Sequence, residues 1–222
     1  MNYNQMIDHT LLKAEATQAQ IDKLLKEAIE YKFKTVCVNS SYIAYCKKAL
    51  KGSGVGITTV VGFPLGACLS SVKAFEAAEA IKAGADEIDM VIEIGKLKDK
   101  DYDYVLNDIK EVKKACGKHT LKVIVETALL TDDEIEEVTK IVMKSGAEFI
   151  KTSTGFSTRG ANLNDVKIMK SVCGYKLLIK AAGGISNYDD MVAMAKAGAN
   201  RFGTSRSVSI ITGKTDGSKG SY

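Results

Sequence analysis

One short junction occurs three times in the sequence, and this repeat constrains the fold more than any other feature. The copies are Ala83-Gly84-Ala85, Ser145-Gly146-Ala147 and Ala197-Gly198-Ala199, each preceded by lysine and followed closely by an apolar run. Glycine tolerates the left-handed conformation in which many helices end, and short apolar runs bounded by turn residues are typical of strands. The repeat therefore predicts a helix-to-strand joint used at least three times.

The helix starts agree with this interpretation. Thr17 with Gln20 and Thr131 with Glu134 fit the capping box, in which the first side chain accepts from the backbone three residues on. Apolar residues follow both pairs at helical spacing, so each segment is expected to form a helix with one apolar face. Helices and strands thus alternate along the chain.

Eight segments are expected to form strands, several of them continuous apolar runs of the kind buried on both faces. They are Met6–Leu11, Thr35–Asn39, Ile57–Gly62, Glu87–Ile94, Leu121–Glu126, Phe149–Thr152, Leu177–Ala181 and Arg201–Gly203. This pattern predicts an α/β protein with a closed (β/α)8 TIM barrel, in a single domain covering residues 1–222. The alternative is an open doubly wound sheet, but no Gly-x-Gly-x-x-Gly follows the first strand.

The amino-acid composition limits which binding partners and which cellular compartment are expected. A net charge of +4, spread along 222 residues, does not predict nucleic-acid binding, and five cysteines without a Cys-x-x-Cys pair favour a reduced, cytoplasmic setting. The longest uncharged stretch, 52–72, contains five glycines and Pro64, so no membrane association is expected. The polar, glycine-rich tail at 213–222 is expected to be flexible.

Three of the predicted strands contain a charge where a packed strand should have none: Asp89, Lys151 and Lys180. Burial of one unpaired charge costs several kcal/mol, so each is either a solvated strand end, part of a structural ion pair, or functional. All three lie near the carboxyl ends of strands, where barrel active sites are found, which favours a catalytic cluster. Asp8 is another strand charge that either orients a lysine or simply pairs with one.

A pair of lysines in such a cluster suggests covalent chemistry. A lysine with its usual pKa of about 10.4 is almost fully protonated at neutral pH, but burial and a second ammonium group lower the pKa. One of Lys151 and Lys180 would then attack a carbonyl to form a Schiff base, while Asp89 moves protons. These residues alone do not identify which lysine is the nucleophile.

Glycines after three strands suggest an anion site, because exposed backbone N–H groups can hold a phosphate. Gly183 and Gly184 follow the Lys180 strand, Gly203 and Ser205 flank Thr204 at the last strand, and Gly155 follows the Lys151 strand. The alternative is that they are ordinary turn residues. His9 and His119 lack the spacing of a metal site, so no metal site is expected, and both are taken as structural or surface residues.

Over essentially its whole length the sequence resembles the deoxyribose-phosphate aldolase family. The motifs that carry the resemblance are Ile7-Asp8-His9-Thr10-Leu11-Leu12, Val36-Cys37-Val38-Asn39, Val61-Gly62-Phe63-Pro64-Leu65-Gly66, Asp86-Glu87-Ile88-Asp89-Met90-Val91, Val125-Glu126-Thr127, Phe149-Ile150-Lys151-Thr152-Ser153-Thr154-Gly155-Phe156 and Lys180-Ala181-Ala182-Gly183-Gly184-Ile185. The resemblance implies a class I aldolase that reversibly cleaves 2-deoxy-D-ribose 5-phosphate to acetaldehyde and D-glyceraldehyde 3-phosphate, in deoxynucleoside catabolism. It also implies that the reaction uses no metal and no organic cofactor.

The same resemblance assigns roles to individual residues. It implies that Lys151 forms the Schiff base, that Lys180 lowers the pKa of Lys151, and that Asp89 relays protons through a water molecule. It also implies a phosphate site at the glycines named above and at Ser205, and a role for the C-terminal Tyr222 in proton transfer. Small phosphorylated sugars and aldehydes are the expected partners, and a homodimer is the expected assembly.

Several positions depart from the family pattern, mostly around the phosphate loops. They are Ser40, Glu93, Arg159, Ser186, Arg206 and Ser207. Arg206 is a candidate for the positive charge that Ser186 lacks. Two other functions remain open: an isomerase or epimerase acting without a covalent intermediate, and a sugar-phosphate-binding protein without catalysis.

Overall fold

The computed structural model describes residues 2–213, which form a closed barrel of eight parallel strands. The strands, in chain order, are β1 Ile7–Leu11, β2 Thr35–Val38, β3 Gly56–Val61, β4 Glu87–Val91, β5 Thr120–Ile124, β6 Phe149–Lys151, β7 Leu178–Ala182 and β8 Arg201–Thr204. Each strand pairs with the next, and β8 pairs with β1 through Asp8 opposite Gly203. The predicted TIM barrel is confirmed, and the open sheet is wrong.

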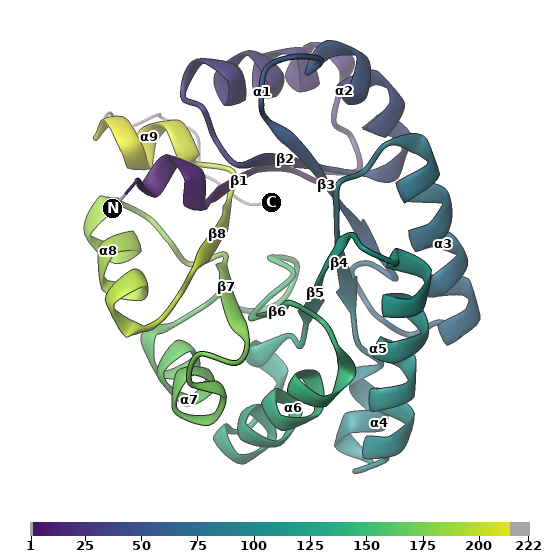
Figure 1. The fold of residues 1–222 in the computed structure, drawn as a ribbon. Helices are drawn as coiled ribbons and strands as arrows, with labels where there is room; N and C mark the ends of the chain where they lie inside the picture. Colours follow the sequence, from purple (N-terminus) through teal and green to yellow (C-terminus); the bar gives the residue numbers. More distant parts are fainter. Residues whose placement is uncertain (1, 214–222) are drawn as a thin grey trace.

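Helices surround the barrel as a continuous outer ring (Figure 1). They are α1 Gln18–Glu30, α2 Ile43–Ala49, α3 Ser70–Ala83, α4 Ile94–Lys98, α5 Tyr102–Cys116, α6 Asp132–Ser145, α7 Leu163–Cys173, α8 Tyr188–Ala197 and α9 Ser207–Thr212. Short 3-10 helices occupy Tyr3–Met6, Ser40–Tyr42 and Thr127–Leu129. The last helix, α9, lies beside α8 and the start of the chain.

The sequence signals for helix ends are confirmed. Both predicted capping boxes form, at Thr17 before α1 and at Thr131 before α6. The three joint glycines, Gly84, Gly146 and Gly198, end α3, α6 and α8 with φ angles of 117°, 87° and 126°. Because side chains with a Cβ are strained at such angles, glycine at these three positions lets each helix stop and turn into the next strand.

Five of the predicted strands were too long at their carboxyl ends, three by one residue and two by more. The strand predicted to run to Ile94 ends at Val91, and Ile94 instead begins α4. The strand predicted to run to Glu126 ends at Ile124, and Glu126 adopts a left-handed φ of 55°. In both places the next residue, Ile92 or Val125, is buried and still donates its N–H to the neighbouring strand, so the sequence carries no signal at the strand end.

The main apolar core lies between the strands and the helices. It contains alternate strand residues such as Ile57, Ile88, Val123 and Ile179, packed against the apolar faces of the helices. Since strand side chains alternate between the two faces, the residues between them point into the barrel. The inward set is mostly charged and polar, with a few apolar members such as Cys37 and Val60, so the barrel interior is where function is to be sought.

Candidate active site

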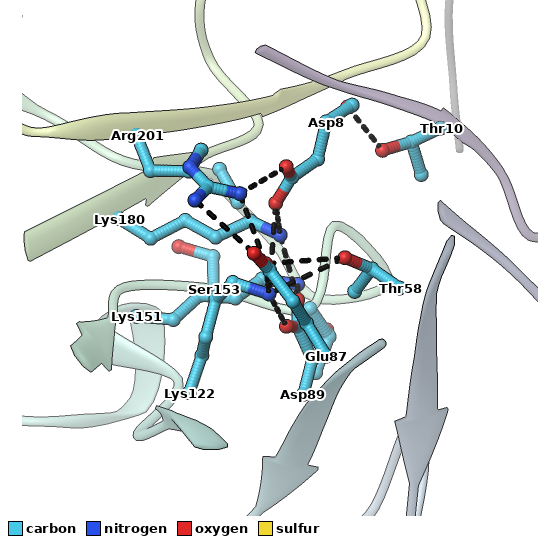
Figure 2. Close-up of polar contacts among 12 residues, drawn as sticks. Asp8, Thr10, Thr58, Glu87, Asp89, Lys122, Lys151, Ser153, Lys180 and Arg201 are labelled. Atoms are coloured by element: carbon cyan, nitrogen blue, oxygen red, sulfur yellow. Dashed lines mark hydrogen bonds and ion pairs between the residues drawn. The ribbon is translucent and has the colours of Figure 1, made fainter. Parts of the chain in front are cut away.

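A cluster of ionisable side chains fills the inside of the barrel (Figure 2). Its members are Asp8, Glu87, Asp89, Lys122, Lys151, Lys180 and Arg201. None is more than 8% exposed. They come from six different strands, and register brings several of them together, as where Asp89 lies opposite Lys122 and Lys151 opposite Lys180.

Asp89 lies at the centre of this cluster and contacts three lysines. Its Oδ2 accepts from Lys151 Nζ at 2.8 Å and from Lys180 Nζ at 2.7 Å. Its Oδ1 accepts from Lys122 Nζ at 2.8 Å. The three residues predicted from sequence, Asp89, Lys151 and Lys180, are therefore in direct contact.

Asp8 and Glu87 complete the network from the other side. Asp8 Oδ2 accepts from Lys180 Nζ at 2.5 Å, and Asp8 Oδ1 accepts from Arg201 at 2.7 Å. Glu87 Oε2 contacts Lys122 Nζ at 2.6 Å and Arg201 at 2.9 Å. Of the two alternatives for Asp8, orienting a lysine or pairing with one, the geometry combines both, because its contact with Lys180 also fixes where that ammonium group lies.

The cations of the cluster differ in how their pKa values are shifted. Burial lowers the pKa of Lys151, the Asp89 carboxylate opposes this, and the neighbouring Lys180 ammonium adds to the lowering, so the pKa of Lys151 lies below its ordinary value. Burial acts in the same direction on Lys180, but the carboxylates of Asp8 and Asp89 outweigh it and raise the pKa of Lys180. Lys122 behaves like Lys180: the carboxylates of Asp89, Asp8 and Glu87 together outweigh burial, and the pKa of Lys122 is raised.

The carboxylates stay ionised. Burial alone would raise the pKa of Asp89, but the ammonium groups of Lys122, Lys151 and Lys180 hold it well below its ordinary value. Asp8 behaves alike, because Lys180 and Arg201 overcome the effect of burial and lower its pKa. Four cationic side chains face three carboxylates, so one positive charge in the cluster has no counter-charge of its own. Loss of one proton, from Lys151, neutralises the cluster.

A cavity of about 170 Å³ lies at the carboxyl ends of β7 and β8, the strands that carry Lys180 and Arg201. Its lining residues are Gly183, Gly184, Ile185, Ser186, Thr204, Ser205 and Arg206. Gly183 and Gly184 have φ angles of 67° and 71°, and a Cβ on Gly184 would lie 2.6 Å from the Ala161 carbonyl oxygen. Only glycine fits at such a position without a shift of the backbone.

Two glycines predicted for the anion site do not line this cavity. Gly203 lies on β8 against the lysine, and a Cβ there would lie 3.1 Å from Lys180 Cε, so glycine makes room for the Lys180 side chain. Gly155 lies in the loop after β6, with a φ of 89°. The preceding Thr154 is held by Glu126, whose carboxylate accepts from both its backbone N–H and its hydroxyl.

The arginines that depart from the family pattern have different environments. Arg159 binds Asp165 at 2.6 Å and the Thr127 carbonyl at 3.0 Å, so its charge is used to join the loops after β5 and β6. Arg206 instead lines the cavity together with Ser186. Tyr222, and with it most of the tail predicted to be flexible, lies outside the described residues.

Three members of the cluster were missed from sequence: Glu87, Lys122 and Arg201. The signal that singled out Asp89, a charge inside an apolar strand, was present at Lys122 in Thr120-Leu121-Lys122-Val123 as well. Glu87 and Arg201 begin their strands, where a charge is usually solvated, and only the closed barrel buries them.

The remaining single residues follow the structural expectation. His119 Nδ1 lies 3.2 Å from the Asp86 carbonyl oxygen, and Cys37 is buried, which raises the pKa of its thiol to about 11. All five cysteines are free. Within residues 2–213 no helix is long and apolar enough to span a membrane, and no three His, Cys, Asp or Glu side chains group as a metal site requires.

Comparison with known proteins places these features in a family. Residues 3–212 match the model of the DeoC/LacD family aldolases. The deoxyribose-phosphate aldolase of Mycoplasmopsis synoviae is 61% identical over 95% of this chain and 96% of its own length, and that of Staphylococcus carnosus is 55% identical over 96% and 97%. The tetrameric deoxyribose phosphate aldolase of Aeropyrum pernix superposes with a TM-score of 0.84 at 31% identity, covering 94% of this chain and 89% of that one. With its lysine-lined barrel and these relatives, the chain belongs to the DeoC/LacD family of aldolases.

Proposed function

We propose that this protein reversibly cleaves 2-deoxy-D-ribose 5-phosphate into acetaldehyde and D-glyceraldehyde 3-phosphate through a Schiff base on Lys151. The observation that carries the assignment of the nucleophile is the pKa pattern of the buried cations. The pKa of Lys151 is lowered, whereas those of Lys122, Lys180 and Arg201 are raised. Only a neutral amine attacks a carbonyl, so Lys151 is the cation of this cluster suited to the task.

The covalent steps follow from this assignment. The Lys151 amine adds to the C1 aldehyde of the substrate and water leaves, which gives the imine. The imine nitrogen takes up a proton, and the C2–C3 bond then breaks as the 3-hydroxyl loses its proton, releasing D-glyceraldehyde 3-phosphate and leaving a neutral enamine on the lysine. Protonation of the enamine carbon and hydrolysis of the resulting imine release acetaldehyde and restore the amine.

Lys180 and Asp89 support these steps without forming bonds to the substrate carbons. Lys180 stays protonated and keeps the pKa of Lys151 low, because both ammonium groups contact the same oxygen of Asp89. Asp89 accepts the proton that Lys151 gives up and returns it by way of a water molecule. Its lowered pKa means that it holds a proton only in passing.

The cavity at β7 and β8 is proposed to hold the substrate phosphate. Backbone N–H groups at Gly184 and Ser205 are suited to bind the anion, with Arg206 adding a positive charge. The N–H of Gly183 donates to the Gly203 carbonyl, so Gly183 serves the site through the shape of the loop. Gly155 and Gly203 contribute to phosphate binding only through the shape that they give to the loop after β6 and to β8. This arrangement places the phosphate at one side of the barrel mouth and the reactive aldehyde over the buried lysines.

Turnover of 2-deoxyribose 5-phosphate tests the proposal. An assay coupled to alcohol dehydrogenase measures acetaldehyde, and chromatography measures D-glyceraldehyde 3-phosphate in equal amount. Interconversion of sugar phosphates without acetaldehyde would instead indicate an isomerase or epimerase. Stabilisation of the protein by the sugar phosphate with no product would indicate a binding protein.

The assembly and location predicted from sequence stand as proposals. We expect a homodimer in the cytoplasm, acting in deoxynucleoside breakdown. Light scattering on the purified full chain tests the assembly, and a mass other than that of two chains would contradict it. Fractionation of cells tests the location.

A further inference from the structure

His9, expected from the sequence to be a structural or surface residue, directly follows Asp8 of the reactive cluster and lies opposite Thr204, which lines the proposed phosphate cavity. On β1 it follows Asp8, which points into the barrel and binds Lys180, so His9 points outward to the helices. Its ring is only 2% exposed and lies 5.1 Å from the Phe33 ring. The position on the strand also places it opposite Thr204 of β8.

Both ring nitrogens of His9 have partners on other elements. Nδ1 lies 2.9 Å from the hydroxyl of Ser207, the first residue of α9, and Nε2 lies 2.9 Å from the carboxylate of Glu27 on α1. The hydrogen bond from His9 is the main reason that the pKa of Glu27 is lowered. This chain of Glu27, His9 and Ser207 is called the His9 relay below.

The two contacts of His9 join three elements. The Ser207 hydroxyl lies within hydrogen-bond distance of both His9 Nδ1, at 2.9 Å, and the Thr204 carbonyl oxygen, at 3.1 Å. The Glu27 carboxylate can only accept, so it accepts from Nε2. His9 therefore ties α9 to β1 and α1 at once.

The segment fixed in this way is the one that lines the cavity. Thr204, Ser205 and Arg206 run from the end of β8 to Ser207, and all three line it. At one end the register with β1 fixes Thr204, and at the other end the fully buried Ser207 is fixed by His9. The rest of the six-residue helix is anchored by Ile210, which is buried in the apolar core, and the contact with His9 fixes its first residue.

We propose that His9 and Ser207 are positioning residues for phosphate recognition: the His9 relay holds the 204–206 segment in the conformation that binds the phosphate. The proposal rests on the proposed function, because it takes that cavity as the phosphate site. It predicts that loss of the relay weakens binding of phosphorylated substrates and leaves the Schiff-base chemistry of Lys151 unaffected.

Two substrates separate these effects: 2-deoxyribose 5-phosphate and 2-deoxyribose, which lacks the phosphate. In Ser207→Ala we expect KM for the phosphorylated sugar to rise roughly fivefold at unchanged kcat, as suits one buried neutral hydrogen bond. We expect kcat/KM of this variant for 2-deoxyribose to stay within twofold of the wild-type value. The matched control is Ser145→Ala, a buried serine that donates in the same way to a carbonyl three residues earlier, at the end of α6. Ser145→Ala should change neither KM for the phosphorylated sugar nor kcat/KM for 2-deoxyribose.

Two histidine variants test which contact of His9 holds the segment. The amide of His9→Asn can occupy the place of Nδ1 and keep a polar partner for Ser207, whereas that of His9→Gln reaches the place of Nε2 and keeps only the contact with Glu27. KM for the phosphorylated sugar should therefore rise more in His9→Gln than in His9→Asn. Trapping of acetaldehyde by borohydride, which involves no phosphate, should proceed at the wild-type rate in both and shows that the barrel is intact.

The outcomes are distinguishable. If the wild-type protein does not cleave 2-deoxyribose 5-phosphate, the proposed function fails and takes this proposal with it. If the wild-type protein is active, an unchanged KM in Ser207→Ala, or an equal loss with both substrates, overturns the relay alone.

Discussion

Replacement of Lys180 by methionine tests whether the Lys180 charge lowers the pKa of Lys151. The substitution keeps the length and apolar stem of the side chain and removes only the charge. Asp8 retains Arg201 at 2.7 Å, and Asp89 retains Lys122 and Lys151 at 2.8 Å, so each carboxylate remains paired. Three cations then face three carboxylates, and the barrel interior is expected to tolerate the change.

The size of the effect follows from the geometry. Since Lys151 Nζ and Lys180 Nζ contact the same oxygen of Asp89 at 2.8 and 2.7 Å, they lie no more than about 5.5 Å apart. Two unit charges at that separation, with an effective dielectric constant of about 20, repel by roughly 3 kcal/mol. Without this repulsion the pKa of Lys151 rises, and the fraction of free amine at neutral pH falls about a hundredfold.

The assay is the rate at which acetaldehyde and cyanoborohydride alkylate Lys151 as a function of pH. In Lys180→Met the rate should be about a hundredfold lower than wild type at pH 7, and the deficit should shrink as the pH rises toward the raised pKa of Lys151. Lys48→Met, which removes an exposed lysine of α2, serves as the control. A deficit that stays constant at every pH, or no deficit at all, would refute the electrostatic role of Lys180.

Three further predictions concern charge. Asp89→Asn leaves buried ammonium groups without their shared carboxylate, so the free energy of unfolding in urea should fall by at least about 3 kcal/mol; a loss below 1 kcal/mol would argue against this pairing. Arg206→Gln should raise KM for 2-deoxyribose 5-phosphate about tenfold and leave 2-deoxyribose unaffected, and equal effects on both sugars would place Arg206 outside the phosphate site. Because the pKa values of Asp8 and Asp89 are lowered by folding, their contribution to stability is complete above a pH of about 4 and is lost as the pH falls further; stability that stays level down to pH 2.5 would contradict this sign.

The fold was predictable because its signals are local. A capping box at Thr17 or a glycine at position 84 determines where a helix begins or ends whatever the rest of the chain does, and both predictions are confirmed. The strand ends at Val91 and Ile124 were less predictable, because apolar side chains continue into buried loops. The spacing of apolar residues indicates which side chains are buried, and buried side chains continue beyond the end of the strand.

The site was only partly predictable, because its electrostatics depend on register. A charge in an apolar strand identifies Asp89, Lys151 and Lys180 from sequence alone. That Asp89 lies opposite Lys122, and that Lys180 receives two carboxylates while Lys151 receives one, follows only from how the strands align. The residues alone therefore left both lysines open as the nucleophile, and the resemblance to a family selected Lys151.

The identity of the lysine that forms the covalent bond is the central claim, and reductive trapping measures it most directly. The full chain is incubated with acetaldehyde and sodium borohydride, and its intact mass and peptide map are compared with those of Lys151→Ala. We expect one ethyl group, located on Lys151 and absent from the variant. An ethyl group on Lys180 instead, or none on a folded wild-type protein, would contradict the account.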